Sequence, residues 1–404
     1  MKKPHIIIVG GGFAGLEVAR GLLRPLKQGK IKLTLINSTN YFLFTPLLHE
    51  VATGGLSASS VAEPLREVFV NTKINIIQGL VTQVDADQKI ISLNDQQLSY
   101  DIAVIATGAT TNYYDTPGAK EYTLPLKTLA DAINIRSRII DAFETASLLT
   151  DTAQRRELLS FVIVGGGATG VELAAELAEF AFSIEHRYFE MSSSCLRKNE
   201  VTVTLVSTSA ELLAQFPAPT RQVAAARLQG LGVILRLGVA VGEVEQDGVN
   251  LNDGWRIPSS LTIWTAGVKA TLPQFIDEST KAKLWSQTNN RAELGAFILG
   301  DAATGLPLLA QVAVAQGKVV ARNILLHLKG RPLLNFVYHS KGSFVSLGQW
   351  FAAGTIGKIN MSGRLTWWLW RTIYLFKFAS NKKRLRIILD WTLNLFYPRD
   401  VTRF

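Results

Sequence analysis

Residues 9–19 read Val-Gly-Gly-Gly-Phe-Ala-Gly-Leu-Glu-Val-Ala, and residues 164–174 read Val-Gly-Gly-Gly-Ala-Thr-Gly-Val-Glu-Leu-Ala. The two stretches agree at seven of eleven positions, so the chain repeats one glycine-rich loop. In both, apolar β-branched residues come before the loop, and apolar residues at helical spacing come after it. A strand, a glycine-rich turn and a helix in this order are typical of a phosphate-binding loop. The repeat therefore predicts two domains built on one plan.

The apolar runs around each loop place the elements of the two units. The predicted strand, helix and strand cover 6–9, 14–23 and 31–36 in the first unit, and 161–164, 168–182 and 201–206 in the second. This order predicts an α/β fold with two Rossmann-like dinucleotide-binding domains.

Three later apolar strands complete the pattern. Those at 102–106 and 261–265 end in Thr107-Gly108 and in Ala266-Gly267, and the strand at 297–299 ends in Gly300-Asp301. The helical stretch that follows is expected to belong to the first domain. Asp301 is expected beside a phosphate or ribityl chain, although it could also cap the following helix.

The three glycines of each motif have different physical tasks. The first permits a tight turn, the second lets backbone N–H groups approach a pyrophosphate, and the third lets the helix pack closely on the strand. These residues are Gly10, Gly12 and Gly15 in the first loop, and Gly165, Gly167 and Gly170 in the second. Glycine clusters also serve plain turns, but the repeat and its flanks favour FAD at the first loop and a nicotinamide cofactor at the second.

The acidic residue that usually binds a ribose is missing from both units. Asn37 ends the second strand of the first unit, and an amide can still accept a hydrogen bond from a ribose hydroxyl. Ser207 occupies the equivalent position in the second unit, where hydroxyls could donate to a 2′-phosphate that a carboxylate would repel. This favours NADPH over NADH. A loop that recognises the ribose by other contacts is the alternative.

Glu172 lies two residues after the third glycine of the second loop. A carboxyl group there could relay protons, or position the nicotinamide or a quinone near a flavin. Glu17 stands at the matching position of the first loop, which instead supports a structural role for both residues.

Composition limits the remaining chemistry. At 404 residues the chain is long enough for two domains and an appendage. We expect the FAD-binding domain at 1–120 and 270–337, the NAD(P)H-binding domain at 121–269, and a C-terminal module at 338–404. Cys195 is the only cysteine, which excludes an intramolecular disulfide, a CxxC redox pair and a multi-cysteine metal site. No metal site is expected.

The C-terminal module carries most of the net charge. Residues 364–404 contain nine Lys or Arg against two Asp, or +7 of the formal +10, and four of the eight Trp. The apolar run at 365–378 is too short to cross a bilayer, and Arg371 and Lys377 interrupt it. Basic and Trp-rich amphipathic helices are typical of a membrane surface, so we expect an anionic membrane as a partner and no nucleic acid. Helices packed on the body or in a dimer interface are the alternative.

Together these motifs resemble the type II NAD(P)H:quinone oxidoreductases, single-subunit, FAD-dependent flavoproteins of the membrane surface. The resemblance covers nearly the full length. Besides both glycine loops, it rests on 40–48 with 51–54, on 106–108, on 265–267, on Gly300-Asp301 and on the Trp-rich tail.

The resemblance implies a flavin site in the first domain, with residues 44–47, including Pro46, near the isoalloxazine. It implies cofactor contacts at Thr107, Gly108 and Gly267. The family's quinone-proximal motif, Ala-Gln-x-x-x-Gln, matches at Gln311, but its second glutamine falls on Ala315 and Gln316 is one position further along.

The implied activity is hydride transfer from NAD(P)H to FAD and transfer of two electrons to a membrane quinone, without proton pumping. In lacking these two acidic residues, the chain resembles the cyanobacterial and plastid branch of the family. Members of that branch act on demethylphylloquinone or plastoquinone, in electron transport and phylloquinone biosynthesis. We expect a peripheral protein on the cytoplasmic face of an inner, plasma or thylakoid membrane. A homodimer is a further expected assembly. An NAD(P)H-dependent reductase of an iron-sulfur protein and a flavin-binding redox sensor are the alternatives, whereas the lone cysteine excludes disulfide and sulfide:quinone reductases.

Overall fold

The computed structural model describes residues 3–94, 96–186, 200–276, 296–303, 307–340, 342–378, 380–397 and 399–403. Cys195 lies outside these ranges. The chain divides into two compact units. Unit 1 contains Met1–Leu43, Ala62–Thr110 and Val268–His339, and unit 2 contains Phe44–Val61, Thr111–Gly267 and Ser340–Phe404.

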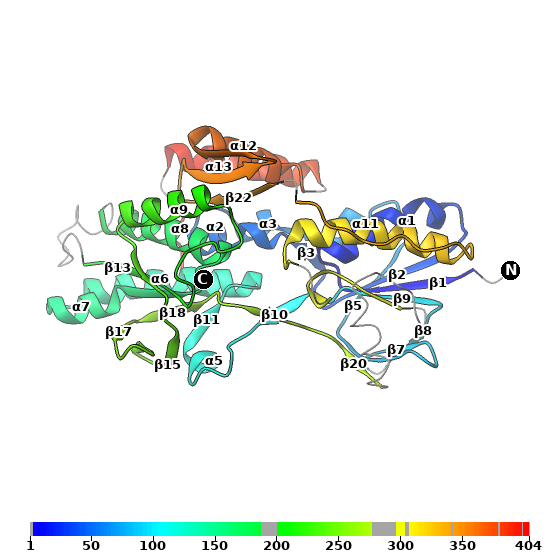
Figure 1. Ribbon diagram of the computed structural model, residues 1–404, viewed down its shortest axis with the longest axis horizontal. Coiled ribbons are helices and arrows are strands. Elements are labelled where there is room, and N and C mark those ends of the chain that lie inside the picture. Colours follow the sequence, from blue (N-terminus) through cyan, green and yellow to red (C-terminus); the bar gives the residue numbers. More distant parts are fainter. Residues whose placement is uncertain are drawn as a thin grey trace. The chain divides into compact units, whose positions relative to one another are not determined.

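Unit 1 is built on a five-stranded parallel sheet in the order β21-β9-β1-β2-β5 (Figure 1). These strands are β1 (His5–Val9), β2 (Lys32–Asn37), β5 (Asn75–Gln78), β9 (Ile102–Ile105) and β21 (Ala296–Ile298). Strands β1, β9 and β21 are mostly apolar and buried, because both faces of a parallel sheet are covered. Strand β5, at the other edge, has polar residues at both ends and is only partly buried. Strand β21 pairs with β9, so the late segment lies in the same sheet and the same unit as the first glycine loop.

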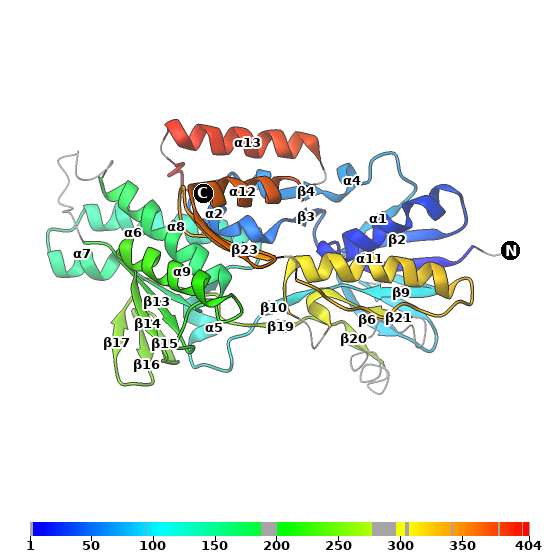
Figure 2. The same cartoon turned by 45° about the horizontal axis from the view of Figure 1, so that its top comes forward.

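Two helices of unit 1, α1 (Phe13–Lys27) and α11 (Ala310–His327), lie side by side (Figures 1 and 2). Glycines stand where the helices approach most closely, because a Cβ at Gly21 would press on Ala321 and one at Gly317 on Ala14. The other elements of unit 1 are β3 (Tyr41–Leu43), β4 (Ala62–Pro64), α4 (Leu65–Val68), β6 (Val81–Asp85), β7 (Ile90–Leu93), β8 (Gln96–Ser99), β20 (Gln274–Phe275) and η4 (Gly300–Ala302).

Unit 2 repeats this plan in a parallel sheet of order β11-β18-β12-β13-β14. Its strands are β11 (Thr123–Pro125), β12 (Ser160–Val164), β13 (Thr202–Ser207), β14 (Ile234–Leu237) and β18 (Leu261–Trp264). Around it lie α5 (Ala119–Tyr122), α6 (Leu129–Ser147), α7 (Thr152–Leu158), α8 (Ala168–Ile184), α9 (Ala218–Gly230), β15 (Val241–Glu245), β16 (Gly248–Leu251) and β17 (Arg256–Pro258). The chain changes unit near β10 (Ala109–Thr111) and β19 (Val268–Ala270).

Two further segments belong to unit 2. The first comprises η1 (Thr45–Leu47), α2 (Leu48–Ala52) and α3 (Ala58–Val61). The second comprises the antiparallel sheet of β22 (Gly342–Ser346), β23 (Ala352–Ile356) and β24 (Ile359–Gly363), then α12 (Arg364–Leu375) and α13 (Asn381–Phe396). The sequence interpretation treated 338–404 as a separate module. Contacts instead group it with unit 2, because β23 and β24 pack on both α9 and α12. In the described residues, no helix combines the length and the hydropathy needed to span a membrane.

The C-terminal segment, residues 399–403, is tied to the interior of unit 2. The guanidinium of Arg399 lies 2.6 Å from Oε2 of Glu176 and 3.7 Å from Oε2 of Glu179, and both glutamates belong to α8. Burial acts to raise the pKa of Glu176, but Arg399, with His49 and Arg371, outweighs it and holds the pKa below its usual value. The last residues of the chain therefore neutralise charge inside the unit.

Replacing Arg399 with Ala should lower the free energy of unfolding by about 3–5 kcal/mol, because it leaves Glu176 as a buried charge without its partner. Arg403→Ala is the matched control, since the Arg403 pair with Asp141 is largely exposed and should contribute only about 0–1 kcal/mol. Denaturant titration followed by circular dichroism measures both. Equal losses in the two variants would contradict the role given to Arg399.

Candidate functional site

The first glycine loop joins β1 to α1 in unit 1, and two of its glycines are required by contact. Gly10 has φ +107°, and a Cβ on it would overlap the carbonyl oxygen of Ala106, at the end of β9. A Cβ on Gly15 would overlap the carbonyl oxygen of Gly10. Gly12, by contrast, would place a Cβ within 4 Å of no described atom. Gly12 precedes the helix N-terminus, so this open space suits an approaching phosphate.

Asn37 holds this loop in place. Its Oδ1 accepts a hydrogen bond from the N–H of Gly11 at 2.7 Å, while its Nδ2 donates to the backbone oxygen of Thr39 at 2.9 Å. The amide oxygen has a second lone pair, which can accept a hydrogen bond from a ribose hydroxyl. The predicted ribose contact stays a prediction, and the structure adds a loop-supporting role that the sequence did not indicate.

The other cofactor residues predicted in unit 1 lie at the same end of the sheet. Thr107 and Gly108 follow β9, Gly300 and Asp301 follow β21, and the loop at Gly10 follows β1. Ligands of parallel α/β sheets bind beyond the carboxyl ends of the strands, so their common placement is what a dinucleotide site requires. The Thr107 hydroxyl donates to the carbonyl oxygen of Thr271, which fixes the turn after β9.

The two glutamines of the predicted quinone motif lie on α11 in different surroundings. Gln316 is buried, and its Oε1 accepts a hydrogen bond from the N–H of Gly300 at 2.8 Å. Gln311, one turn earlier, is only partly buried. Gln316 therefore supports the turn that carries Asp301. A quinone contact stays a prediction for both glutamines.

The second loop, between β12 and α8 of unit 2, repeats the geometry of the first. Gly165 has φ +123°, and a Cβ on it would lie 2.7 Å from Oγ1 of Thr265, just after β18. A Cβ on Gly170 would overlap the carbonyl oxygen of Gly165, whereas Gly167 has no described atom within 4 Å of its Cβ position. Gly267, also beyond β18, has φ +69°. Glycines at equivalent positions of the two loops therefore have equivalent contacts in both units.

Ser207 faces the second loop as Asn37 faces the first. Its side chain is buried, a Cβ at Gly166 would lie 2.6 Å from its Oγ, and that oxygen accepts the N–H of Ser209 at 3.3 Å. A hydroxyl that accepts one hydrogen bond keeps its own proton for donation. The predicted contact with a 2′-phosphate stays a prediction.

Glu17 and Glu172 occupy matching sequence positions but different environments. Glu17 is partly buried, with Oε2 3.7 Å from Nη1 of Arg20. Glu172 is 7% exposed, and its Oε1 accepts the N–H of Ser346 at 3.2 Å. Burial raises the pKa of Glu172 to about 7. A carboxyl group that titrates there can give and take protons at physiological pH.

Sequence reasoning missed the ionisable residues gathered around Glu172. This buried ionisable cluster lies entirely in unit 2 and consists of His49, Glu50, Glu172, Glu176, Glu179, Arg371 and Arg399. The signal was present in the short helix α2, where His49 and Glu50 interrupt an apolar run. Ionisable residues in such a run are either paired or functional.

Arg371 shows how the cluster joins the elements of unit 2. Its guanidinium lies 3.7 Å from the ring centroid of Trp367 and 4.4 Å from that of Trp391, and its Nη2 is 3.8 Å from Glu50 Oε2. Trp391 in turn donates its indole N–H to the same Glu50 oxygen at 2.8 Å. Pro46, predicted near the flavin, lies in η1 just before α2 and is half-buried.

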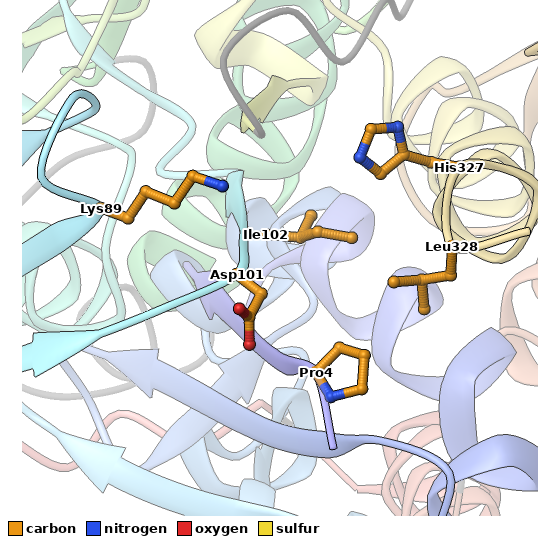
Figure 3. A pocket seen from close by; sticks show the side chains of 6 residues that line it. All are labelled: Pro4, Lys89, Asp101, Ile102, His327 and Leu328. Atoms are coloured by element: carbon orange, nitrogen blue, oxygen red, sulfur yellow. The ribbon is translucent and has the colours of Figure 1, made fainter. Parts of the chain in front are cut away.

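A pocket of about 260 Å³ lies at the opposite edge of unit 1 (Figure 3). Its lining residues are Pro4, Lys89, Asp101, Ile102, His327 and Leu328. Pro4 precedes β1 and Ile102 begins β9, so the pocket lies at the amino ends of the strands. It is therefore separate from the glycine loop and is not the dinucleotide site.

Two family models match successive parts of the chain. The family model "Pyridine nucleotide-disulphide oxidoreductase" matches residues 4–317, and the model "NDH2 C-terminal domain" matches residues 340–400. The structure of NDH2 from Plasmodium falciparum in complex with NADH superposes with a TM-score of 0.88 over 99% of this chain and 100% of that one. Its 20% sequence identity shows the fold alone.

Curated relatives match over nearly the full length. Type II NADH:quinone oxidoreductase Ndh of Mycobacterium tuberculosis is 32% identical, over 98% of this chain and 89% of the relative. Demethylphylloquinone reductase NdbB of Synechocystis is 30% identical, over 96% of each chain. The repeated glycine loops, the matched C-terminal segment and these relatives agree: the chain belongs to the type II NADH:quinone oxidoreductase family of FAD-dependent flavoproteins.

Proposed function

We propose that the protein passes a hydride from NAD(P)H to FAD and two electrons onward to a membrane quinone, without pumping protons. The observation that carries this proposal is the second glycine loop, which repeats the contacts of the first and so provides for two dinucleotides. The relatives supply the acceptor, since their names refer to quinones and one to demethylphylloquinone. Demethylphylloquinone, plastoquinone or a similar prenylated quinone is the proposed substrate.

The first loop, with Asn37 and Asp301, would hold FAD, which supplies the redox chemistry when bound. The second loop, with Ser207, would hold the nicotinamide cofactor, and NADPH is favoured because neither Ser207 nor its neighbours carry a negative charge. The relative from Mycobacterium tuberculosis is named for NADH, so measuring the preference of this protein for NADPH or NADH tests the proposal directly.

Membrane attachment is proposed from helix α13, because its polar residues face the rest of unit 2 and its apolar residues are exposed. Asp390 accepts hydrogen bonds from Ser57 and Ser60, and Asn394 donates to the carbonyl oxygen of Gly55, so the polar side faces the rest of unit 2. The exposed apolar residues of this helix and its end are Leu385, Ile388, Leu389, Leu393, Phe396 and Tyr397. An outward apolar face with exposed basic residues nearby fits the headgroup region of an anionic membrane. The cytoplasmic face, and a homodimer, are parts of the same proposal.

An iron-sulfur acceptor is a weaker alternative. Ferredoxin reductase of the CYP199A2 system from Rhodopseudomonas palustris has a related structure, with a TM-score of 0.67 over 88% of this chain. That likeness, at 21% identity, concerns the fold. Turnover with a ferredoxin but with no quinone would favour this alternative.

Gly12→Ala and Gly167→Ala separate the two dinucleotide sites. Neither Cβ would meet a described atom, so both variants should fold, and each methyl group should block only the phosphate that approaches its loop. Gly12→Ala should lower the FAD content of the purified protein. Gly167→Ala should keep FAD and raise the KM for NAD(P)H by about tenfold or more, in line with ~1.4 kcal/mol per tenfold. Normal FAD content in Gly12→Ala would contradict the first assignment.

Ser207→Asp should reduce the ratio of kcat/KM for NADPH to that for NADH, because a carboxylate repels the 2′-phosphate. The expected fall is roughly tenfold or more, or ~1.4 kcal/mol. Ser207→Ala, which removes the hydroxyl without adding charge, is the control and should change the ratio much less. A strong preference of the unaltered protein for NADH would refute the proposal on NADPH.

Leu389→Glu tests the membrane surface without deleting the tail, whose Arg371 and Arg399 stabilise the interior. Binding to vesicles containing anionic lipids should weaken by about tenfold or more, since burying one leucine side chain contributes ~1.5–3 kcal/mol. Leu148→Glu is the matched control, because Leu148 is a highly exposed leucine at the end of α6. Equal vesicle binding by both variants would contradict this surface.

A further inference from the structure

One buried histidine of unit 2 has a ring nitrogen without a partner. His49 is 2% exposed, and within the described residues its Nε2 makes no hydrogen bond. Its Nδ1 lies 3.7 Å from Oε2 of Glu172. This distance is that of an ion pair, and a small shift or a proton between the two atoms would turn it into a hydrogen bond. A buried polar atom left unsatisfied is costly, so Nε2 requires a group that the described residues do not supply.

Other unpartnered polar atoms gather around the same two residues. Within the described ranges they include Oγ of Ser346, Oε1 of Glu50 and Nε of Arg371, all buried. Glu50 follows His49 in α2, Ser346 donates its N–H to Glu172, and Arg371 pairs with Glu50. Ordered water usually satisfies such groups in protein interiors. The interior of unit 2 therefore has the polarity for water beside His49 and Glu172.

The elements packed around this pair carry further titratable or charged groups. These are Glu50 from α2, Glu176 from α8, Arg136 from α6, Arg371 and Tyr374 from α12, and Arg399 from the C-terminal segment. Burial raises the pKa of Glu172 and that of Tyr374. Glu50 and Glu176 also act to raise the pKa of Glu172, whereas His49 acts to lower it.

Quinone reduction requires one proton more than NAD(P)H supplies. NAD(P)H supplies two electrons and one proton, whereas a quinone takes up two electrons and two protons when it becomes a quinol. The second proton comes from the solvent and must reach a site where electrons are transferred. This requirement rests on the proposed function, and it asks for a group that exchanges a proton near neutral pH.

We propose that His49 and Glu172 form a proton-transfer couple that holds the second proton and releases it during quinone reduction, with ordered water at Nε2 of His49 as its supply. The proton leaves the couple for a quinone oxygen, and water returns a proton to the couple before the next turnover. The two electrons come from NAD(P)H, so charge and atoms balance. His49 thereby gains a function that its apolar sequence surroundings did not indicate.

The test uses the FAD-loaded protein and four variants. His49→Asn keeps an amide near the place of Nδ1, and His49→Gln keeps one near the place of Nε2, but neither amide can be protonated and deprotonated at neutral pH. Glu172→Gln removes the carboxyl group. Glu17→Gln is the matched control, because Glu17 stands at the equivalent position of the first repeat, outside the buried ionisable cluster. FAD content and thermal unfolding are measured first for each variant.

Three measurements follow. Anaerobic bleaching of the flavin by NAD(P)H should be unchanged in both His49 variants. Turnover with quinone should fall by roughly 10²-fold in these variants and in Glu172→Gln, as expected for loss of general acid catalysis. Infrared titration of the carboxyl band that Glu172→Gln abolishes should show protonation near pH 7, moving to higher pH in His49→Asn because a group that lowers this pKa is lost.

Quinone turnover and a carboxyl titration that are both unchanged in the His49 variants would overturn the proposal. So would an equal loss of flavin reduction by NAD(P)H, which would indicate a structural effect. Should these variants fail to fold, a crystal structure of the unaltered protein decides: ordered water on Nε2 supports the couple, and a dry apolar contact there refutes it. If the unaltered protein reduces no quinone, the proposed function falls, while the infrared titration still reports whether the two residues share a proton.

Discussion

Both units depend on one constraint, the close approach of a helix N-terminus to the strand before it. Gly15 and Gly170 make this approach possible, because a Cβ on either would overlap the carbonyl oxygen of Gly10 or Gly165. The first glycine of each loop also lies against the end of a neighbouring strand. Sheet, loop and helix are thereby fixed together, and the backbone N–H groups at each helix start point to one place. The arrangement of the predicted glycine-loop residues follows from this contact.

Similar loops nevertheless lie in different electrostatic settings. Where unit 1 has Glu17, a partly buried glutamate with arginine and lysine neighbours, unit 2 has Glu172 in a buried ionisable cluster. The difference arises from segments far away in sequence, since residues 44–61 and 340–404 cover α8 in unit 2. These segments remove water from Glu172 and place His49 beside it. The same motif therefore lies in a different electrostatic environment in each unit because of what packs on it.

The C-terminal part of unit 2, residues 340–404, has two roles that cannot be separated by truncation. Its helix α13 directs Asp390 and Asn394 inward and leucines outward, which is the reverse of an ordinary surface helix. Arg371 and Arg399 from the same segment neutralise glutamates in the interior. The proposed membrane surface is therefore built on the residues that hold the buried ionisable cluster together. Attachment and the environment of Glu172 are structurally linked.

The sequence by itself determined the two-domain α/β plan, the limits of both loops to within a few residues, and the return of the strand before Gly300 to the first sheet. Local rules suffice there, because strand periodicity and glycine spacing act over short stretches. The sheet at 342–363 was not predicted, since its short strands are rich in small residues and lack clear alternation. Tertiary structure alone decided that Gln316 supports Gly300, that Asn37 holds Gly11, and that His49 meets Glu172. Such contacts join residues distant in sequence, and the pKa of a carboxyl group depends on burial and neighbours that no local pattern encodes.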